Sequence, residues 1–129
     1  MILLDTSAWV EFLRDTGSTV CERVDALLED EIATCHPVRM EVLAGARDDQ
    51  HLGRLRGLLA RASLLATEPA DYEEAAALYR ACRRQGETVR RLIDCLIAAT
   101  AIRTSTPVLH LDSDFEILAR YTLLELDRP

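Results

Sequence analysis

The chain of 129 residues contains no lysine, and all 15 of its basic residues are arginine. A P-loop needs a lysine to contact nucleotide phosphates, and Schiff-base enzymes need a lysine amine, so both classes are excluded. Phosphotransfer folds of the receiver or haloacid type use a lysine beside their aspartates and are disfavoured for the same reason. The chemistry of this chain must therefore rest on other side chains.

Long apolar runs and metal-type cysteine spacings are also missing. The longest apolar candidate, residues 95–102, has eight residues, whereas a membrane span needs about 18. The N-terminus lacks a basic region and reaches Asp5 almost at once, unlike a signal peptide. Cysteines at positions 21, 35, 82 and 95 form no CxxC pair. These features favour buried, reduced thiols over disulfides and predict a cytoplasmic protein without membrane contact.

The size and composition indicate one folded domain over residues 1–129. The mass is 14.4 kDa and 49% of the residues are hydrophobic, which is enough for a sizeable core. The net charge is −7, yet residues 80–91 carry five arginines against Glu87 alone. This basic stretch is either a solvated helix face or a phosphate-binding surface. Its candidate phosphate-binding residues are Arg80, Arg83, Arg84, Arg90 and Arg91.

Hydrophobic periodicity predicts an alternation of short strands and helices. The expected strands cover residues 1–4, 31–34, 63–66, 108–111 and 121–126. The expected helices cover residues 8–14, 20–28, a segment opened by Pro37, about 51–60, 72–85, 92–103 and a short segment after a capping box at 113–116. Five short apolar strands separated by helices predict an α/β fold with a parallel five-stranded sheet that helices cover on both faces.

Two aspartates follow predicted strands directly: Asp5 after the first strand and Asp112 after the fourth. Ligands of open parallel sheets bind beyond the carboxyl ends of the strands. Aspartate also ends strands and starts turns for purely structural reasons, so either residue alone leaves both interpretations open.

Three further acids have unusual settings. Asp94 lies in an almost wholly apolar helix, where a carboxylate is costly unless it is paired or binds metal; the alternative is a helix-start cap or a partner of a buried arginine. Glu41 shares a helix face with apolar residues, or else it is a surface glutamate paired with Arg39 or Arg47. Asp114 is either the first-turn acid of the capping box or, with Asp112, a ligand of a shared cation.

Converging acids without lysine repel one another, and a divalent cation relieves that repulsion. Oxygen ligands suit Mg²⁺ or Mn²⁺, and the scattered histidines and cysteines offer no zinc set. Metal ions in such sites hold a phosphodiester and activate a water for in-line attack. The acids therefore predict a nuclease.

The same segments resemble a known family. LLDTSAWVEFLR at the start, RMEVLAGA at 39–46, IDCLIAATA at 93–101 and LHLDSDFEILA at 109–119 are similar to the four signature segments of the PIN domain, and more narrowly of the VapC toxins of bacterial toxin–antitoxin pairs. The resemblance covers the whole chain and implies a three-layer α/β/α sandwich.

The resemblance also implies roles for individual residues. Asp5, Glu41, Asp94 and Asp112 correspond to the acidic catalytic quartet, and Asp114 to an additional acid. Of these, Asp5, Asp94, Asp112 and Asp114 are the expected metal ligands. Thr6 and Ser7 correspond to supporting polar positions after the first acid.

The implied activity is Mg²⁺-dependent endoribonucleolysis of tRNA or rRNA by a metal-activated water, with Mn²⁺ able to substitute. The implied partners are an RNA substrate, a VapB-type antitoxin that blocks the active site, and a second copy of the chain in a homodimer. Two alternatives stay open: a non-catalytic PIN-like module that binds RNA or protein, and a DNA flap nuclease or exonuclease, for which the chain is short.

Overall fold

A four-stranded parallel sheet forms the centre of the computed structural model, which describes all residues from 1 to 129. The strands are β1 (Ile2–Leu4), β2 (Ile32–Cys35), β3 (Ser63–Leu65) and β4 (Val108–Leu109). Their order is β3-β2-β1-β4, so β1 pairs with both β2 and β4. The predicted α/β class with a parallel sheet is confirmed.

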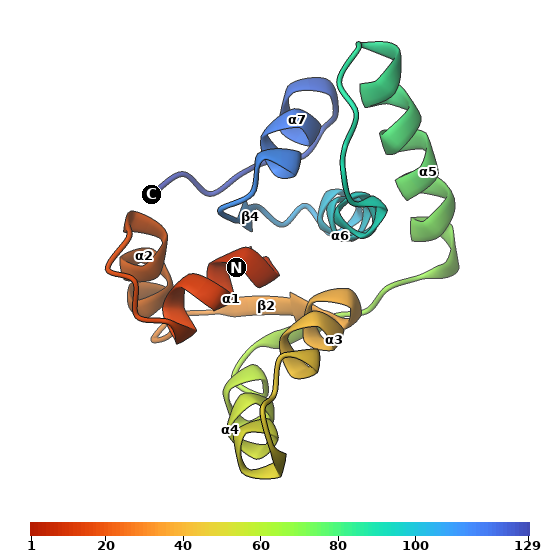
Figure 1. The fold of residues 1–129 in the computed structure, drawn as a ribbon. Coiled ribbons are helices and arrows are strands. Elements are labelled where there is room, and N and C mark those ends of the chain that lie inside the picture. Colours follow the sequence, from red (N-terminus) through yellow and green to blue (C-terminus); the bar gives the residue numbers. More distant parts are fainter.

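Seven helices surround this sheet and form two groups (Figure 1). They are α1 (Thr6–Leu13), α2 (Thr19–Leu27), α3 (His36–Ala44), α4 (Asp49–Leu59), α5 (Pro69–Arg84), α6 (Leu92–Arg103) and α7 (Ser113–Tyr121). Helix α1 packs on α2 and α3, and α3 packs on α4. Helices α5, α6 and α7 pack on one another in the upper part of Figure 1, and α6 also contacts α3.

The prediction of a fifth strand at 121–126 is wrong. Tyr121 belongs to helix α7, and the hydroxyl of Thr122 donates to the Leu118 carbonyl, so the helical turn extends into this segment. Leu126 forms only an isolated parallel bridge with Val108, in which the Val108 N–H donates to the Glu125 carbonyl and the Asp127 N–H donates to the Val108 carbonyl. The segment therefore pairs with β4 at one position and forms no strand of its own.

Local sequence signals explain where most helices begin. Pro37 and Pro69 occupy the first turns of α3 and α5, where a missing N–H costs nothing. Helix α5 starts with a capping box between Glu68 and Asp71, and Gly86, at φ +84°, follows its end. The predicted capping box at 113–116 is wrong, because Asp112 is the N-cap of α7 and its side chain accepts from the Asp114 N–H.

The core consists of 28 buried hydrophobic residues from both helix groups and the sheet. Helix α6 passes through its middle, with buried residues from Asp94 to Ala101 on nearly every side. All four cysteines are buried and none is bonded to another. No helix of the structure has both the length and the apolar character that crossing a membrane requires.

Candidate active site

The carboxyl ends of the parallel strands bring the predicted acids to one edge of the sheet. Asp5 follows β1 directly and is the N-cap of α1, whereas Asp112 follows β4 and is the N-cap of α7. Glu41 comes from α3, which begins directly after β2. The interpretation of Asp5 and Asp112 as cap residues is therefore correct, and a cap residue at this edge can still take part in a site.

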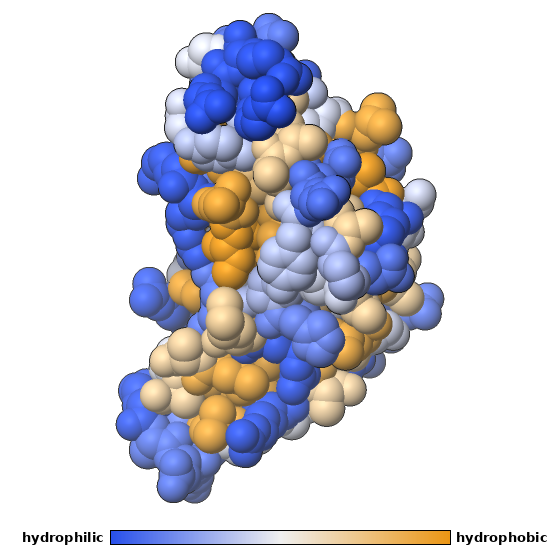
Figure 2. Space-filling model, turned by 90° about the vertical axis from the view of Figure 1, so that its right-hand side faces the viewer, coloured by the Kyte–Doolittle hydropathy of each residue, from blue (hydrophilic) through white to orange (hydrophobic).

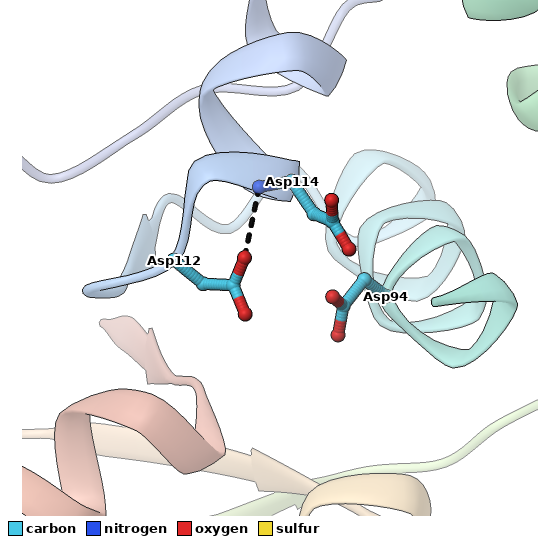
Figure 3. Close-up of side chains that lie close together, drawn as sticks. All are labelled: Asp94, Asp112 and Asp114. Carbon is cyan, nitrogen blue, oxygen red and sulfur yellow. Dashed lines mark hydrogen bonds between the residues drawn. The ribbon is translucent and has the colours of Figure 1, made fainter. Parts of the chain in front are cut away.

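Asp94, Asp112 and Asp114 form a compact acidic cluster. Each offers one carboxylate oxygen, and the three oxygens lie within 4.8 Å of one another. Figure 3 shows the three side chains converging, with Asp112 and Asp114 projecting from the start of α7 and Asp94 from α6. Asp94 and Asp114 are 1% and 0% exposed, so both carboxyl groups are removed from water.

The surroundings of the Asp94 carboxyl strongly disfavour its ionised form. Burial, a hydrogen bond shared with Asp114 and the charge of Asp5 raise its pKa from 3.8 to about 8. Its Oδ2 atom is buried and has no hydrogen-bond partner. Asp94 is thus not half of a buried ion pair, and a bound cation would satisfy its free oxygen.

The pKa of the Asp114 carboxyl is shifted in the opposite direction, below its usual value. Burial alone would raise its pKa, but hydrogen bonds from the Arg90 backbone, the Asp94 carboxyl and the Arg91 backbone more than offset this effect, so the pKa lies below its usual value. The Arg90 N–H donates to Oδ1 and the Arg91 N–H to Oδ2, each at 3.1 Å. Asp114 therefore remains ionised and fixes the turn that leads into α6.

Asp5 lies at the edge of this cluster, and Ser7 holds it in place. The Ser7 backbone N–H and hydroxyl both donate to Asp5 Oδ2, at 3.0 and 2.5 Å. The Ser7 hydroxyl also accepts from the Leu111 N–H at 2.9 Å, which ties the end of β1 to the segment after β4. Burial raises the pKa of Asp5 in spite of the Ser7 bonds, and its Oδ1 atom is buried without a partner.

Glu41 faces the same region from α3. The Thr6 hydroxyl donates to its Oε1 at 2.9 Å, and the Arg91 guanidinium pairs with its Oε2. The sequence-based alternative of a pair with Arg39 or Arg47 is wrong. Thr6 thus orients Glu41, and Ser7 orients Asp5.

The basic stretch at 80–91 divides into two parts with different partners. Arg80, Arg83 and Arg84 are exposed on α5 and make no ion pair. Arg90 instead pairs with Asp112 at 3.2 Å and Asp114 at 3.5 Å, and Arg91 pairs with Glu41. Sequence reasoning grouped all five as one surface and missed that two of them contact the acids. The signal was their place directly before the apolar helix that carries Asp94.

The donor set fits a hard divalent cation. The cluster provides carboxylate oxygens only, and the buried Oδ1 of Asp5 and Oδ2 of Asp94 lack partners. Burial and the neighbouring acids raise the pKa of Asp94 to about 8. A divalent ion close to these groups would lower that pKa and supply the missing partners. The arrangement suits metal-assisted hydrolysis of a phosphodiester.

Comparison with known proteins identifies the family of the chain. The PIN domain family matches residues 2–121. Ribonuclease VapC11 of Mycobacterium tuberculosis and VapC ribonuclease Mb1587 of Mycobacterium bovis are each 49% identical to the chain over 129 residues, which is 97% of this chain and 96% of the relative.

Solved structures show the same fold. VapBC2 from Rickettsia felis, bound to a promoter DNA fragment, has a TM-score of 0.78 at 20% identity and covers 98% of both chains. VapBC-5 from Mycobacterium tuberculosis has a TM-score of 0.69 at 25% identity and covers 99% of this chain and 98% of its own. The chain therefore belongs to the PIN domain family and, within it, to the VapC ribonucleases.

Proposed function

We propose that this protein is a Mg²⁺-dependent endoribonuclease that acts as the toxin of a toxin–antitoxin pair. One observation carries the proposal: a largely buried cluster of carboxylates beside Asp5, with unpartnered oxygens on Asp5 and Asp94, in a chain 49% identical to two named VapC ribonucleases. A binding module would need neither the cluster nor the electrostatic strain at Asp94.

Asp5, Asp94 and Asp112 would hold the cation, with Asp114 behind them. When bound, Mg²⁺ supplies Lewis-acid stabilisation of the phosphate and lowers the pKa of a water so that it can attack phosphorus. The unpartnered oxygens of Asp5 and Asp94 provide ligands without breaking an existing hydrogen bond. Ser7 orients Asp5, and Asp114 fixes the turn before Asp94.

Glu41 completes the catalytic quartet in this proposal. Its Oε1 atom is oriented by Thr6, so the carboxylate faces the cluster from the side of α3. Such a carboxylate can accept a proton from an attacking water and orient that water. Because water and not the ribose hydroxyl is the nucleophile, the products carry a 5′-phosphate and a 3′-hydroxyl.

The partners follow from the family. A VapB-type antitoxin would cover the acidic site, and a second copy of the chain would form a homodimer. An exposed apolar hollow of about 250 Å³ between α5 and the start of α6 supports the homodimer. Figure 2 shows apolar residues gathered on this face. Tyr72 and Leu92, which line the hollow, are 61% and 60% exposed. We place the protein in the cytoplasm, where its RNA substrate and reduced cysteines belong.

The test is to incubate purified protein with total RNA in Mg²⁺ or EDTA and to map the 5′ ends of the products. Cleavage in Mg²⁺ alone, at defined positions, is expected. Asp94→Asn keeps the shape of the side chain and should abolish cleavage, whereas Asp25→Asn, an exposed acid on α2, is the matched control and should not. Full activity of the Asp94 variant would remove Asp94 from the site.

A further inference from the structure

Arg90 contacts one of the proposed metal ligands, Asp112, and Arg91 contacts Glu41 beside them. The Arg90 guanidinium lies 3.2 Å from Asp112 Oδ1 and 3.5 Å from Asp114 Oδ1, and the Arg91 guanidinium bonds Glu41 Oε2. These contacts place two positive charges on a site built from acids. A carboxylate oxygen that accepts from a guanidinium is less available to a cation, so the arginines and the cation compete.

Asp114 holds the backbone of the two arginines, whereas their side chains reach solvent. Both backbone N–H groups donate to the fully buried Asp114 carboxylate, which anchors the turn. The side chains are 67% and 47% exposed, so solvent reaches both guanidinium groups. Each can therefore change partner without moving the chain that carries it.

A displaced guanidinium would remain at the edge of the site. Its planar array of donors matches a phosphate group as well as a carboxylate. We propose that Arg90 and Arg91 exchange partners: they hold the acids when the cation is absent, and they bind RNA phosphates when the cation occupies the acids. The RNA half of this inference rests on the proposed function.

In this exchange, Arg90 and Arg91 weaken metal binding while RNA is absent. Once the cation is bound, the same two side chains hold the RNA. The arginines of α5 lack this property, because Arg80, Arg83 and Arg84 pair with no acid. Loss of an α5 arginine can weaken RNA binding, but it cannot free a metal ligand.

Mn²⁺ binding by calorimetry, without RNA, tests the competition. Exposed ion pairs change an equilibrium by up to about fivefold each. Arg90→Gln, which removes two pairs, should therefore bind Mn²⁺ roughly 3- to 10-fold more tightly than the wild type. Arg56→Gln loses the same charge at an exposed position on α4, which lies at the opposite end of Figure 1 from α7, and should bind Mn²⁺ like the wild type. Equal Mn²⁺ affinity in the wild type and Arg90→Gln would overturn the competition.

Binding of a ten-nucleotide RNA in Ca²⁺ or EDTA tests the second half, with intact RNA verified on a gel. Ca²⁺ should strengthen RNA binding by the wild type, and Arg90→Gln/Arg91→Gln should lose most of this gain. The salt dependence in Ca²⁺ should also flatten by roughly 0.7 in log–log slope for each RNA phosphate that an arginine no longer neutralises. Wild-type RNA affinity and slope in the double variant would overturn the exchange.

These experiments distinguish failure of the arginine exchange from failure of the proposed nuclease function. If the wild type cleaves RNA but the variants bind Mn²⁺ and RNA normally, the exchange is wrong and the nuclease stands. If the wild type cleaves no RNA while Arg90→Gln still binds Mn²⁺ more tightly, the nuclease proposal fails and the competition stands.

Discussion

Replacing Asp94 by asparagine should stabilise the metal-free protein, although Asp94 is buried at the centre of the fold. Burial, the bond to Asp114 and the charge of Asp5 raise the Asp94 pKa from 3.8 to about 8. At about 1.4 kcal/mol per pKa unit, keeping a proton on this group at pH 7 costs the folded state up to roughly 4 kcal/mol. Water entering the site lowers this cost, so we expect a gain of about 1–3 kcal/mol, or roughly 3–10 °C in Tm for a chain of this size.

The gain should depend on pH with a definite sign. A carboxyl whose folded pKa is raised binds more protons in the folded state than in the unfolded chain. The stability of the wild type in EDTA should therefore fall as pH rises from about 4 to about 8, by at most about 1.4 kcal/mol per pH unit from this group. Asparagine does not titrate, so the stability difference between Asp94→Asn and the wild type should be small at pH 5 and large at pH 8.

Thermal unfolding in EDTA at pH 5, 6, 7 and 8 measures the stability gain and its pH dependence. The same series is then repeated with Mn²⁺ in place of EDTA. Mn²⁺ should stabilise the wild type by RT ln(1 + [L]/Kd), about 2.7 kcal/mol at 100 Kd, and the Asp94 variant much less. The control, Asp25→Asn, should follow the wild type throughout. A variant that is destabilised in EDTA at every pH and keeps the full Mn²⁺ response would show that Asp94 is a structural residue and not a metal ligand.

Three other changes test separate features of the molecule. Ser7→Ala removes the hydroxyl that bonds Asp5 and the Leu111 N–H, so RNA cleavage should slow by roughly 10- to 100-fold, and an unchanged kcat would place Ser7 outside the site. Glutamine at Arg80, Arg83 and Arg84 together should flatten the salt dependence of RNA binding by roughly 0.7 in slope for each phosphate that these arginines neutralise, whereas an unchanged slope would mark a solvated face. Leu92→Glu should turn a dimer into a monomer in light scattering, and a dimer that survives would exclude the apolar hollow as its interface.

Most of the fold could be predicted because its signals are local. Short apolar runs marked the four strands, and prolines at the first turns of α3 and α5 marked where those helices begin. The segment 121–126 was misjudged because its apolar residues fit a strand pattern equally well, whereas α7 in fact continues through Tyr121. A single bridge at Leu126 depends on the distance from the end of α7 to β4, which periodicity does not encode.

The acids of the site could also be predicted, because each had an unusual place in the pattern. Asp5 and Asp112 follow strands, and Asp94 lies in the first turn of an otherwise largely apolar helix. Their partners could not be predicted, because contacts such as Arg91 with Glu41 join residues 50 positions apart. Long, flexible arginine side chains reach several acids, and only the packing of α3 against α6 decides which one.

Cleavage of one RNA substrate across a Mg²⁺ titration shows whether the acidic cluster is a metal-dependent nuclease centre. The wild type and Asp25→Asn should cleave in proportion to Mg²⁺ occupancy, stop in EDTA, and leave a 5′-phosphate and a 3′-hydroxyl. Asp112→Asn should give no product above the EDTA background at any Mg²⁺ concentration. Cleavage in EDTA, products ending in 2′,3′-cyclic phosphate, or wild-type rates in the Asp112 variant would each contradict this assignment of the cluster.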